Sequence, residues 1–295
     1  MSRKNIFQKM QEIHNYDKEI LRIESLLNKD KCIAIKYTDL RQIRYHYYNI
    51  QSFVDKYLFL EWKNRGNYIS CNEMRNDLQI NRLVYYCESG IDVAIEDLFD
   101  YLEYVANILN LIKNCKWDNE NNVIDKQICK AIINNIKNIL ETLNYEIYKI
   151  DDQKIIVVEK NPAATAVAEI MDENIAYKVI QYNHYLLKGD IEAKKRILLV
   201  LGNKLEPQRS QLKSLNNKLE TNIFFMLNNM NLRHNNCDIN DEKRYKNFVA
   251  EMSKDKLENY YDELYQMILL AFLLIDNINR TKEIENLKIK IGGQQ

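Results

Sequence analysis

The chain has 295 residues, of which 46% are hydrophobic and 28% are charged, as is usual for a globular protein. Its 42 basic and 42 acidic residues cancel, which excludes a global attraction to nucleic acid or membranes and leaves only local patches for such contacts. Only 2 prolines and 6 glycines interrupt the sequence. This scarcity of helix breakers predicts a mostly α-helical protein with long helices.

The sequence shows no signature of secretion, of a membrane span or of a bound cofactor. The N-terminus has no apolar signal core, and the longest apolar run, residues 267–275, is too short to cross a bilayer. No two of the six cysteines form C-x-x-C, and we find no zinc spacing, phosphate-binding loop or dinucleotide fingerprint. We therefore expect a cytoplasmic protein with free, mostly buried thiols and without a metal or cofactor.

Helical spacing of apolar residues predicts five helices in the N-terminal part of the chain. Their expected ranges are 3–29, 38–64, 70–86, 91–113 and 124–143. The third begins at Ser70, which has the form of a capping box together with Glu73.

One segment, 145–159, predicts a β-hairpin. In its first part, residues 145–150, apolar or aromatic and polar residues alternate. Residues 151–153 can form a turn, and the second part is rich in β-branched residues. A lone hairpin is marginal in water, so this one has to pack on the helices. It also suggests the domain organisation, which we predict as an N-terminal helical domain, a hairpin connector and a C-terminal helical domain at 1–144, 145–160 and 161–295.

The C-terminal part is predicted to return to helices at Asn161-Pro162, where Asn is the N-cap and Pro the first helical residue. Further helices are expected at 162–171, 172–187 and 191–201, the last ended by Gly202.

Two long helices with apolar seams complete the chain. The first begins at Pro207 and the second ends near the C-terminus, and the seams step by three and four along Leu212, Leu215, Leu219, Ile223, Met226, Met230 and along Leu257, Tyr261, Leu264, Ile268, Ala271, Ile275, Ile278. Such seams favour an antiparallel pair at a shallow crossing angle within a multi-helix bundle.

The densest polar cluster lies between these two helices, at residues 228–236. Arg233 can hold a phosphate bidentately, and His234 can exchange protons near neutral pH. Adjacent residues of a helix point about 100° apart, so this pair can share one phosphate only if the helix ends before it. The alternative is structural, because Arg, His and Asn residues are common where a helix ends.

The segment 162–291, with Asn-Asn-x-Asn-Leu-Arg-His-Asn-Asn between its long helices, resembles the HEPN superfamily and, within it, the C-terminal regions of bacterial abortive-infection proteins. The resemblance implies an all-α, usually dimeric fold and metal-independent RNase activity in phage defence. Arg233 matches the arginine of the R-x(4–6)-H motif of that family. The sequence departs from the motif, because His234 directly follows this arginine and no histidine lies four to six residues after it.

Other residues of this segment are candidates for supporting the same chemistry. Beside Arg233 and His234 as the catalytic pair, we expect the imidazole and amides of His184, Asn231, Asn235 and Asn236 to assist. The run 188–220 has eight basic and four acidic residues, which indicates a phosphate-tracking face with Lys194, Lys195, Arg196 and Arg209 as RNA contacts. Solvated helix faces are the alternative interpretation.

Two N-terminal stretches are also asymmetric in charge. Residues 31–65 hold seven basic and three acidic side chains and include Arg41 and His46, a secondary candidate for RNA contact on an aromatic helix face. Residues 73–103 hold eight acidic and two basic side chains, a pattern that can face a basic surface or imitate nucleic acid.

The leading hypothesis is therefore an abortive-infection-type protein whose C-terminal part binds or cleaves RNA. RNA, a second copy of the chain and a partner protein or antitoxin are the expected partners, and no membrane is expected. The alternative is a non-catalytic helical scaffold in which the Arg-His-Asn-Asn cluster is structural. An inhibitor that uses the acidic stretch is a third hypothesis.

Overall fold

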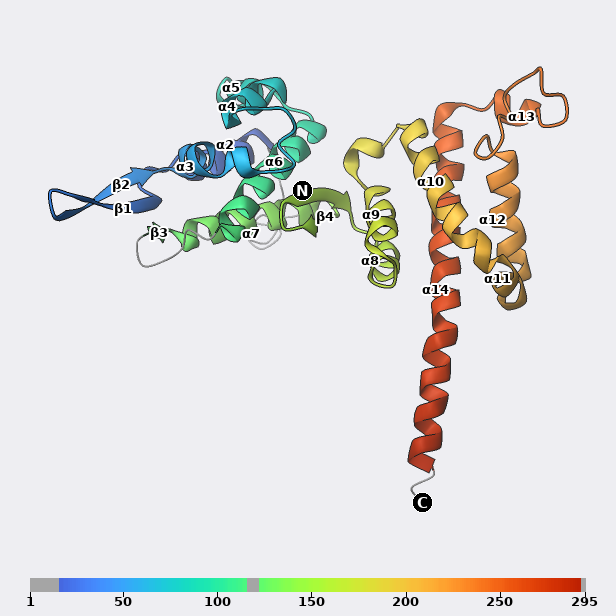
Figure 1. Ribbon diagram of the computed structural model, residues 1–295. Coiled ribbons are helices and arrows are strands. Elements are labelled where there is room, and N and C mark those ends of the chain that lie inside the picture. Colours follow the sequence, from blue (N-terminus) through green and yellow to red (C-terminus); the bar gives the residue numbers. More distant parts are fainter. Residues whose placement is uncertain (1–15, 116–121, 293–295) are drawn as a thin grey trace, which may run out of the picture. The chain divides into compact units, whose positions relative to one another are not determined.

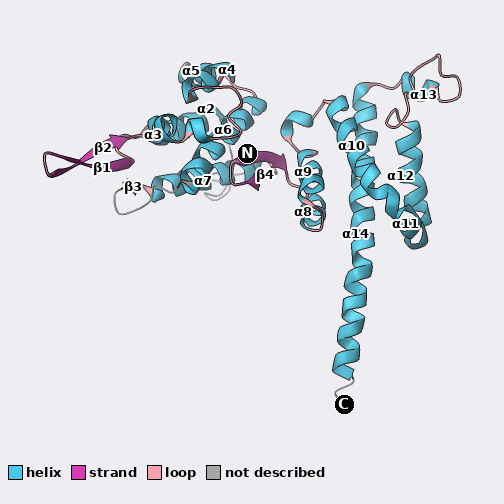
Figure 2. Cartoon of the chain, viewed as in Figure 1, coloured by secondary structure: helices cyan, strands magenta, loops and turns pink. Residues whose placement is uncertain are grey.

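The structure, a computed structural model, describes residues 16–115 and 122–292 (Figure 1). It is mostly helical, as predicted, with two small antiparallel β-hairpins and a long C-terminal helix (Figure 2). The chain divides after Lys160 into two compact units, which we call unit 1 and unit 2. The first part of the helix predicted at 3–29 lies outside the described residues.

Unit 1 is built around α6 (Ile95–Asn114), whose residues 104–112 are all buried. A helix that is apolar on nearly all sides is stable only where other elements cover all of its faces. The other helices in the described part of unit 1 are α2 (Tyr16–Leu27), α3 (Ile50–Tyr57), the 3₁₀ helix η1 (Phe59–Glu61), α4 (Cys71–Asp77), α5 (Ile80–Glu88) and α7 (Lys126–Thr142).

The helix predicted from Ser70 to Tyr86 is two helices. Its start is as predicted, because the Ser70 hydroxyl accepts a hydrogen bond from the Glu73 N–H at 3.1 Å. The break lies at Gln79, which has a φ of 58° in the left-handed region. No glycine or proline marks this position, and for that reason the sequence pattern did not reveal the break.

The prediction of one long helix at 38–64 was wrong, because most of the first half of this range forms β-strands. β1 (Ile33–Asp39) and β2 (Gln42–Tyr48) pair in an antiparallel hairpin, and a short β3 (Asn122–Ile124) pairs with the start of β1. The two turn residues, Leu40 and Arg41, have φ values of 46° and 67°. A turn of this type is usually indicated in the sequence by Asn-Gly or Asp-Gly. Neither pair occurs here, so the sequence pattern did not predict the hairpin.

The hairpin predicted at 145–159 is confirmed, as β4 (Tyr145–Asp151) and β5 (Lys154–Glu159). Polar side chains of α6 hold its free edge. Asn107 accepts from the Ile155 N–H at 2.9 Å and donates to the Ile155 carbonyl at 2.8 Å. Glu103, one turn earlier, accepts from a further N–H of β5 at 2.7 Å. The hairpin is thus part of unit 1, and α6 takes the place of a third strand.

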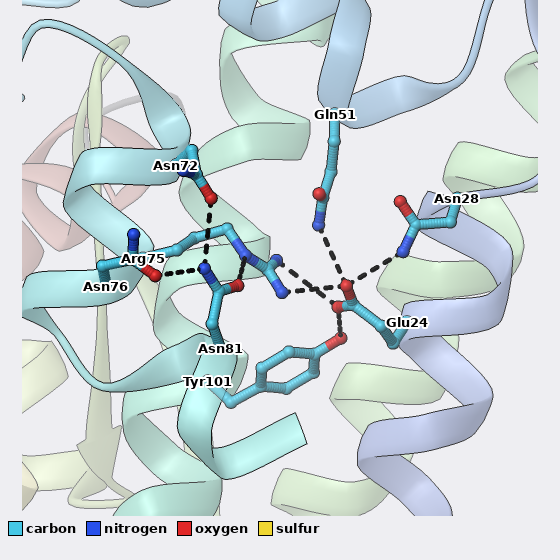
Figure 3. A network of polar contacts seen from close by, with 8 residues as sticks. All are labelled: Glu24, Asn28, Gln51, Asn72, Arg75, Asn76, Asn81 and Tyr101. Carbon is cyan, nitrogen blue, oxygen red and sulfur yellow. Dashed lines mark hydrogen bonds and ion pairs between the residues drawn. The ribbon is translucent and has the colours of Figure 1, made fainter. Parts of the chain in front are cut away.

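A buried ion pair joins α2 and α4 inside unit 1 (Figure 3). The guanidinium of Arg75, which is 5% exposed, lies 2.9 Å from the Glu24 carboxylate. Tyr101 donates to the same carboxylate at 2.8 Å, and burial keeps the pKa of Tyr101 well above its ordinary value, so its hydroxyl stays a donor. Asn81 accepts from the Arg75 Nε at 2.7 Å. Both charges are therefore paired and hydrogen-bonded where little water can reach them, since the two side chains are 6% and 12% exposed.

Unit 2 consists of helices. They are α8 (Pro162–Glu169), α9 (Glu173–Gln181), the 3₁₀ helix η2 (Tyr185–Leu187), α10 (Ile191–Leu205), the 3₁₀ helix η3 (Glu206–Gln208), α11 (Arg209–Leu215), α12 (Asn217–Asn229), α13 (Asn247–Ala250) and α14 (Lys254–Gly292). The predicted start is confirmed, because the Asn161 side chain accepts from the Ala164 N–H at 3.1 Å and Pro162 lies in the first turn.

Two predicted boundaries in unit 2 were wrong. Gly202 does not end a helix, since α10 continues to Leu205, and a Cβ at Gly202 would lie 2.9 Å from the Leu227 side chain. This glycine instead allows close packing against α12. The helix predicted from Pro207 to Met230 is interrupted at Asn216, whose side chain accepts from the Leu219 N–H at 3.0 Å and begins α12.

The C-terminal helix α14 is 39 residues long and supports unit 2. It runs opposite to α12 (Figure 1), as the two seams predict. Its buried residues include five of the seven expected seam positions, namely Tyr261, Leu264, Ile268, Ala271 and Ile275. The beginning and end of the predicted seam, Leu257 and Ile278, are only half-buried.

We expect Arg75→Ala to lower the free energy of unfolding of unit 1 by about 3–5 kcal/mol, because it leaves the buried Glu24 carboxylate without its cation. Arg22 provides the control, since its pair with Glu19 lies on the surface and its side chain is 59% exposed. Arg22→Ala should cost less than about 1 kcal/mol. Urea unfolding followed by circular dichroism measures both, and similar losses would contradict the assigned role of the Glu24–Arg75 pair.

Candidate functional site

The polar cluster at 228–236 follows the end of α12. The last helical residue is Asn229, and Asn231 has a φ of 57°, which turns the chain away from the helix axis. The Arg233 N–H then donates to the Leu227 carbonyl at 3.0 Å and satisfies one of the last carbonyls of the helix. Arg233 and His234 therefore lie in a turn, which is the condition that the sequence set for the two side chains to share one phosphate.

The guanidinium of Arg233 is paired with a carboxylate of its own unit. It forms an ion pair with Glu206, and its side chain is only 20% exposed. It also lies 5.5 Å from the centre of the Phe224 ring. Arg209, 4.2 Å from the centre of the same ring, is paired with Glu220 at 2.5 Å. Both expected phosphate ligands thus have carboxylate partners and aromatic support.

The asparagines of the cluster organise the loop that follows. Asn236 is 1% exposed, accepts from the Asn231 N–H at 2.9 Å and donates to the Arg244 carbonyl at 2.8 Å. Its backbone N–H also donates to the His234 carbonyl at 3.0 Å. The Asn235 side chain accepts from the Cys237 N–H at 3.3 Å. These contacts are those of a turn that has to satisfy its own backbone groups.

The sequence predicted that His184 lies within the helix 172–187. In the structure His184 lies in the turn between α9 and η2. Its Nδ1 accepts from the Leu186 N–H at 3.3 Å, and its ring packs on Tyr185 with the ring centres 4.5 Å apart. His234 is half-buried in the turn after α12. The two imidazoles thus belong to different turns of unit 2.

Lys194, expected on an RNA-binding face, is a buried structural cation. It is 6% exposed and lies 2.7 Å from Glu258 and 2.6 Å from Asp262. Tyr182 donates to the same Asp262 oxygen at 2.8 Å and stacks on Tyr265, with the ring centres 4.0 Å apart. This cluster joins α9, α10 and α14. Of the other cations expected on α10, Lys195 is half-buried and Arg196 is exposed.

The six cysteines are free, and they differ in burial. Cys32, Cys71 and Cys87 are buried, as expected, whereas Cys237 is exposed. Burial raises the pKa of the Cys71 thiol to about 12 and that of Cys87 to about 11, so these thiols stay protonated near neutral pH. Among the described residues, no group of three or more His, Cys, Asp and Glu side chains could hold a metal ion.

The β1–β2 ribbon of unit 1 presents a second candidate site. Tyr45 and Tyr47, two positions apart on β2, share one face with Lys36, which lies opposite Tyr45. The two rings are 45% and 54% exposed, with their centres 6.3 Å apart. The Lys31 ammonium lies 5.7 Å from the centre of the Tyr47 ring. We call these four residues the tyrosine face.

The opposite face of the ribbon also carries aromatic and basic groups. His46 stacks on Tyr37 with the ring centres 4.1 Å apart, and Arg44 pairs with Asp39 at 3.0 Å. Arg41, with its left-handed backbone, lies at the tip of the ribbon. The secondary candidates Arg41 and His46 thus belong to an exposed β-ribbon and not to a helix face.

The sequence interpretation missed the tyrosine face because it treated 38–64 as one helix. The available signal was the density of β-branched and aromatic residues over 33–48, which is typical of strands. On a helix, adjacent tyrosines spread around the axis, whereas on a strand Tyr45 and Tyr47 point the same way. Only the correct backbone period therefore brings these two rings together.

Comparisons with known proteins found no match to this chain among family models, curated proteins or solved structures. No helix in the described ranges combines the length and the apolar character that spanning a membrane requires.

The acid stability of unit 2 is expected to depend on Glu258. Burial disfavours its charge, but the Gly189 N–H and the Lys194 ammonium outweigh burial, so the pKa of Glu258 lies below its ordinary value of 4.5. A carboxyl with a lowered pKa in the fold stabilises it above that ordinary value, and this contribution is lost as the pH falls through the folded pKa. Glu258→Gln should therefore lose less stability than wild type below about pH 5.

Urea unfolding of unit 2 at a series of pH values measures this difference. Glu263→Gln is the matched control, because Glu263 is exposed on the same helix. It should keep the wild-type dependence on pH. If Glu258→Gln also kept it, the paired carboxylate would not be a source of the acid sensitivity.

Proposed function

We propose that this chain binds single-stranded RNA through the tyrosine face of the β1–β2 ribbon. The observation that carries the proposal is the pair of exposed rings, Tyr45 and Tyr47, beside Lys31 and Lys36. Unpaired bases stack on such rings whatever their sequence, and lysines hold the phosphates between them. Since the net charge of the whole chain is zero, the attraction to RNA has to arise locally, as it does on this face.

Several features favour RNA over other partners of an exposed ribbon. A protein partner without acidic side chains would bury the two rings but would gain little from the flanking cations, whereas single-stranded RNA uses both. A base-paired duplex hides the faces of its bases, so two rings on one face fit single strands better.

We expect Tyr45→Ala and Tyr47→Ala each to weaken the binding of a labelled single-stranded RNA by about tenfold, because stacking contributes about 1–3 kcal/mol per base. Fluorescence anisotropy with the full chain measures the affinity. Tyr85→Ala is the control, since Tyr85 is 62% exposed on α5 of the same unit and should bind as wild type does. Lys31→Ala and Lys36→Ala should each reduce the salt slope by about 0.7.

The RNA proposal fails if wild type does not bind RNA, or if Tyr85→Ala weakens binding as much as the ribbon variants do. Equal affinity for a fully paired duplex would contradict recognition by stacking. A single-stranded DNA of the same sequence tests whether the 2′-hydroxyl contributes to recognition.

Metal-independent RNA cleavage at Arg233 and His234 is a second candidate function, and the role in phage defence that the resemblance implies would follow from it. The favouring observation is that α12 ends at Asn229. His234 would take the proton of the 2′-hydroxyl as its oxygen attacks the phosphorus, and Arg233 would stabilise the charge on the phosphate. The bond from phosphorus to the 5′-oxygen would break, and the 5′-oxygen would leave with a proton from the His234 imidazolium or from water. For this, Arg233 would have to exchange Glu206 for the phosphate.

We therefore expect Glu206→Gln, which removes the competing carboxylate, to increase cleavage of total RNA in EDTA, and Arg233→Ala and His234→Ala to abolish it. Gel electrophoresis measures the products, and circular dichroism verifies that each variant is folded. Equal cleavage by all variants, or none by wild type and Glu206→Gln, would leave the alternative: a structural cluster in a non-catalytic scaffold.

A further inference from the structure

The C-terminal part of α14 lies beyond the helices that cover its beginning (Figure 1). The last buried residue of the described part of α14 is Ile275. Four apolar side chains nevertheless follow on this exposed part. Ile284, Leu287 and Ile291, which are 51%, 50% and 63% exposed, lie on one side of the helix, and Ile289 lies on the other. A long helix with so many exposed apolar residues has a second face to cover.

These residues continue a regular stripe that begins inside unit 2. The steps from Leu270 to Leu273, and onwards to Ile291, alternate between three and four residues, which is the heptad pattern of a coiled coil. At about 100° per residue, the stripe lies roughly opposite the seam that faces the other helices of unit 2. Leu270 on this stripe is itself 48% exposed. α14 thus carries two apolar faces, and unit 2 covers one of them.

The side chains along the stripe match those of a parallel two-stranded coiled coil. Ile284 and Ile291 occupy a positions, and Leu273 and Leu287 occupy d positions, the arrangement that favours two parallel helices. Leu270 and Asn277 also occupy a positions. A single polar residue there weakens the coil but sets its register, because it is best satisfied opposite another asparagine.

The charges beside the stripe indicate that the partner is identical. Glu283 occupies a g position and Lys288 the following e position. In a parallel pair in register, each g side chain faces the e side chain five residues later on the other helix, so two copies form this ion pair twice. Arg280 at a d position is the least favourable residue. Its Nε already pairs with Asp276 at 2.5 Å along the helix edge, and its long stem can cover apolar surface.

We propose that α14 binds α14 of a second copy of this chain as a parallel, in-register coiled coil through this stripe. The stripe belongs to unit 2, so this proposal is independent of RNA binding by the ribbon of unit 1. The dimer buries Ile284, Leu287 and Ile291, which are otherwise exposed to water.

Sedimentation of the full chain over a concentration series tests the association. Wild type should reach twice the chain mass of 35.3 kDa, and the double variant Ile284→Asp with Leu287→Asp should remain at the chain mass. Ile289→Asp is the control, because Ile289 is 71% exposed on the side of α14 away from the stripe. This variant should dimerise as wild type does. Circular dichroism verifies that α14 stays helical in each variant.

Charge reversal and cross-linking test the orientation. Glu283→Lys and Lys288→Glu should each weaken the dimer, and the double variant should restore it. Leu287→Cys, with Cys237→Ser to remove the exposed native thiol, should form a disulfide-linked dimer on oxidation, because d positions lie side by side only in a parallel coil in register.

Three outcomes overturn the proposal. A wild-type chain that stays monomeric at all concentrations has no such interface. A dimer that survives Ile284→Asp with Leu287→Asp uses another surface. Failure of the Leu287→Cys chain to cross-link, while it still dimerises, contradicts the parallel register and points to an antiparallel pair or to a different occupant of the stripe.

Discussion

Both units depend on a buried cation that is paired with carboxylates of other helices. Arg75 is held by Glu24 in unit 1, and Lys194 by Glu258 and Asp262 in unit 2. A charge that leaves water loses its hydration, and only an opposite charge and well-placed hydrogen bonds can offset this loss. Each of these clusters joins different helices, so the helices have to meet in one arrangement for the charges to be satisfied.

The same constraint decides which cations can act on a partner. Arg209 and Arg233 look like phosphate ligands in the sequence, yet each is paired with a glutamate and lies near the Phe224 ring. The ribbon differs, because Lys31 and Lys36 lie beside exposed tyrosines and not in a buried cluster. The lysines of the ribbon can therefore bind phosphates directly, whereas Arg233 can bind a phosphate only after Glu206 is displaced.

The two proposed interaction surfaces share one physical feature. Each lies on an element that extends from its own unit, namely the ribbon in unit 1 and α14 in unit 2 (Figure 1). Each of these elements carries exposed apolar or aromatic side chains. Exposed apolar groups weaken solubility unless a partner covers them. On the ribbon, the nearby lysines indicate a polyanion, whereas on α14 the heptad positions indicate another helix of the same sequence.

Local chemistry in the sequence was sufficient for several features. The structure confirms the N-caps at Ser70 and Asn161 and most of the predicted seam of α14. It also confirms the high helix content that the scarcity of Gly and Pro predicts. Each of these signals acts within a few residues of the chain. The hairpin at 145–159 belongs to the same group, because its alternation and its turn are local. The heptad stripe of α14 is equally present in the sequence, although its exposure is not.

Only the tertiary structure decided the remaining features, because they depend on partners far away in the sequence. Lys194 is buried since Asp262, 68 residues later, lies beside it. The ribbon forms although Leu40 and Arg41 are poor residues for its turn, and Gly202 continues its helix because Leu227 packs against it. Sequence spacing describes one element at a time, whereas pairing, burial and the exposed face of an element are properties of the elements packed together.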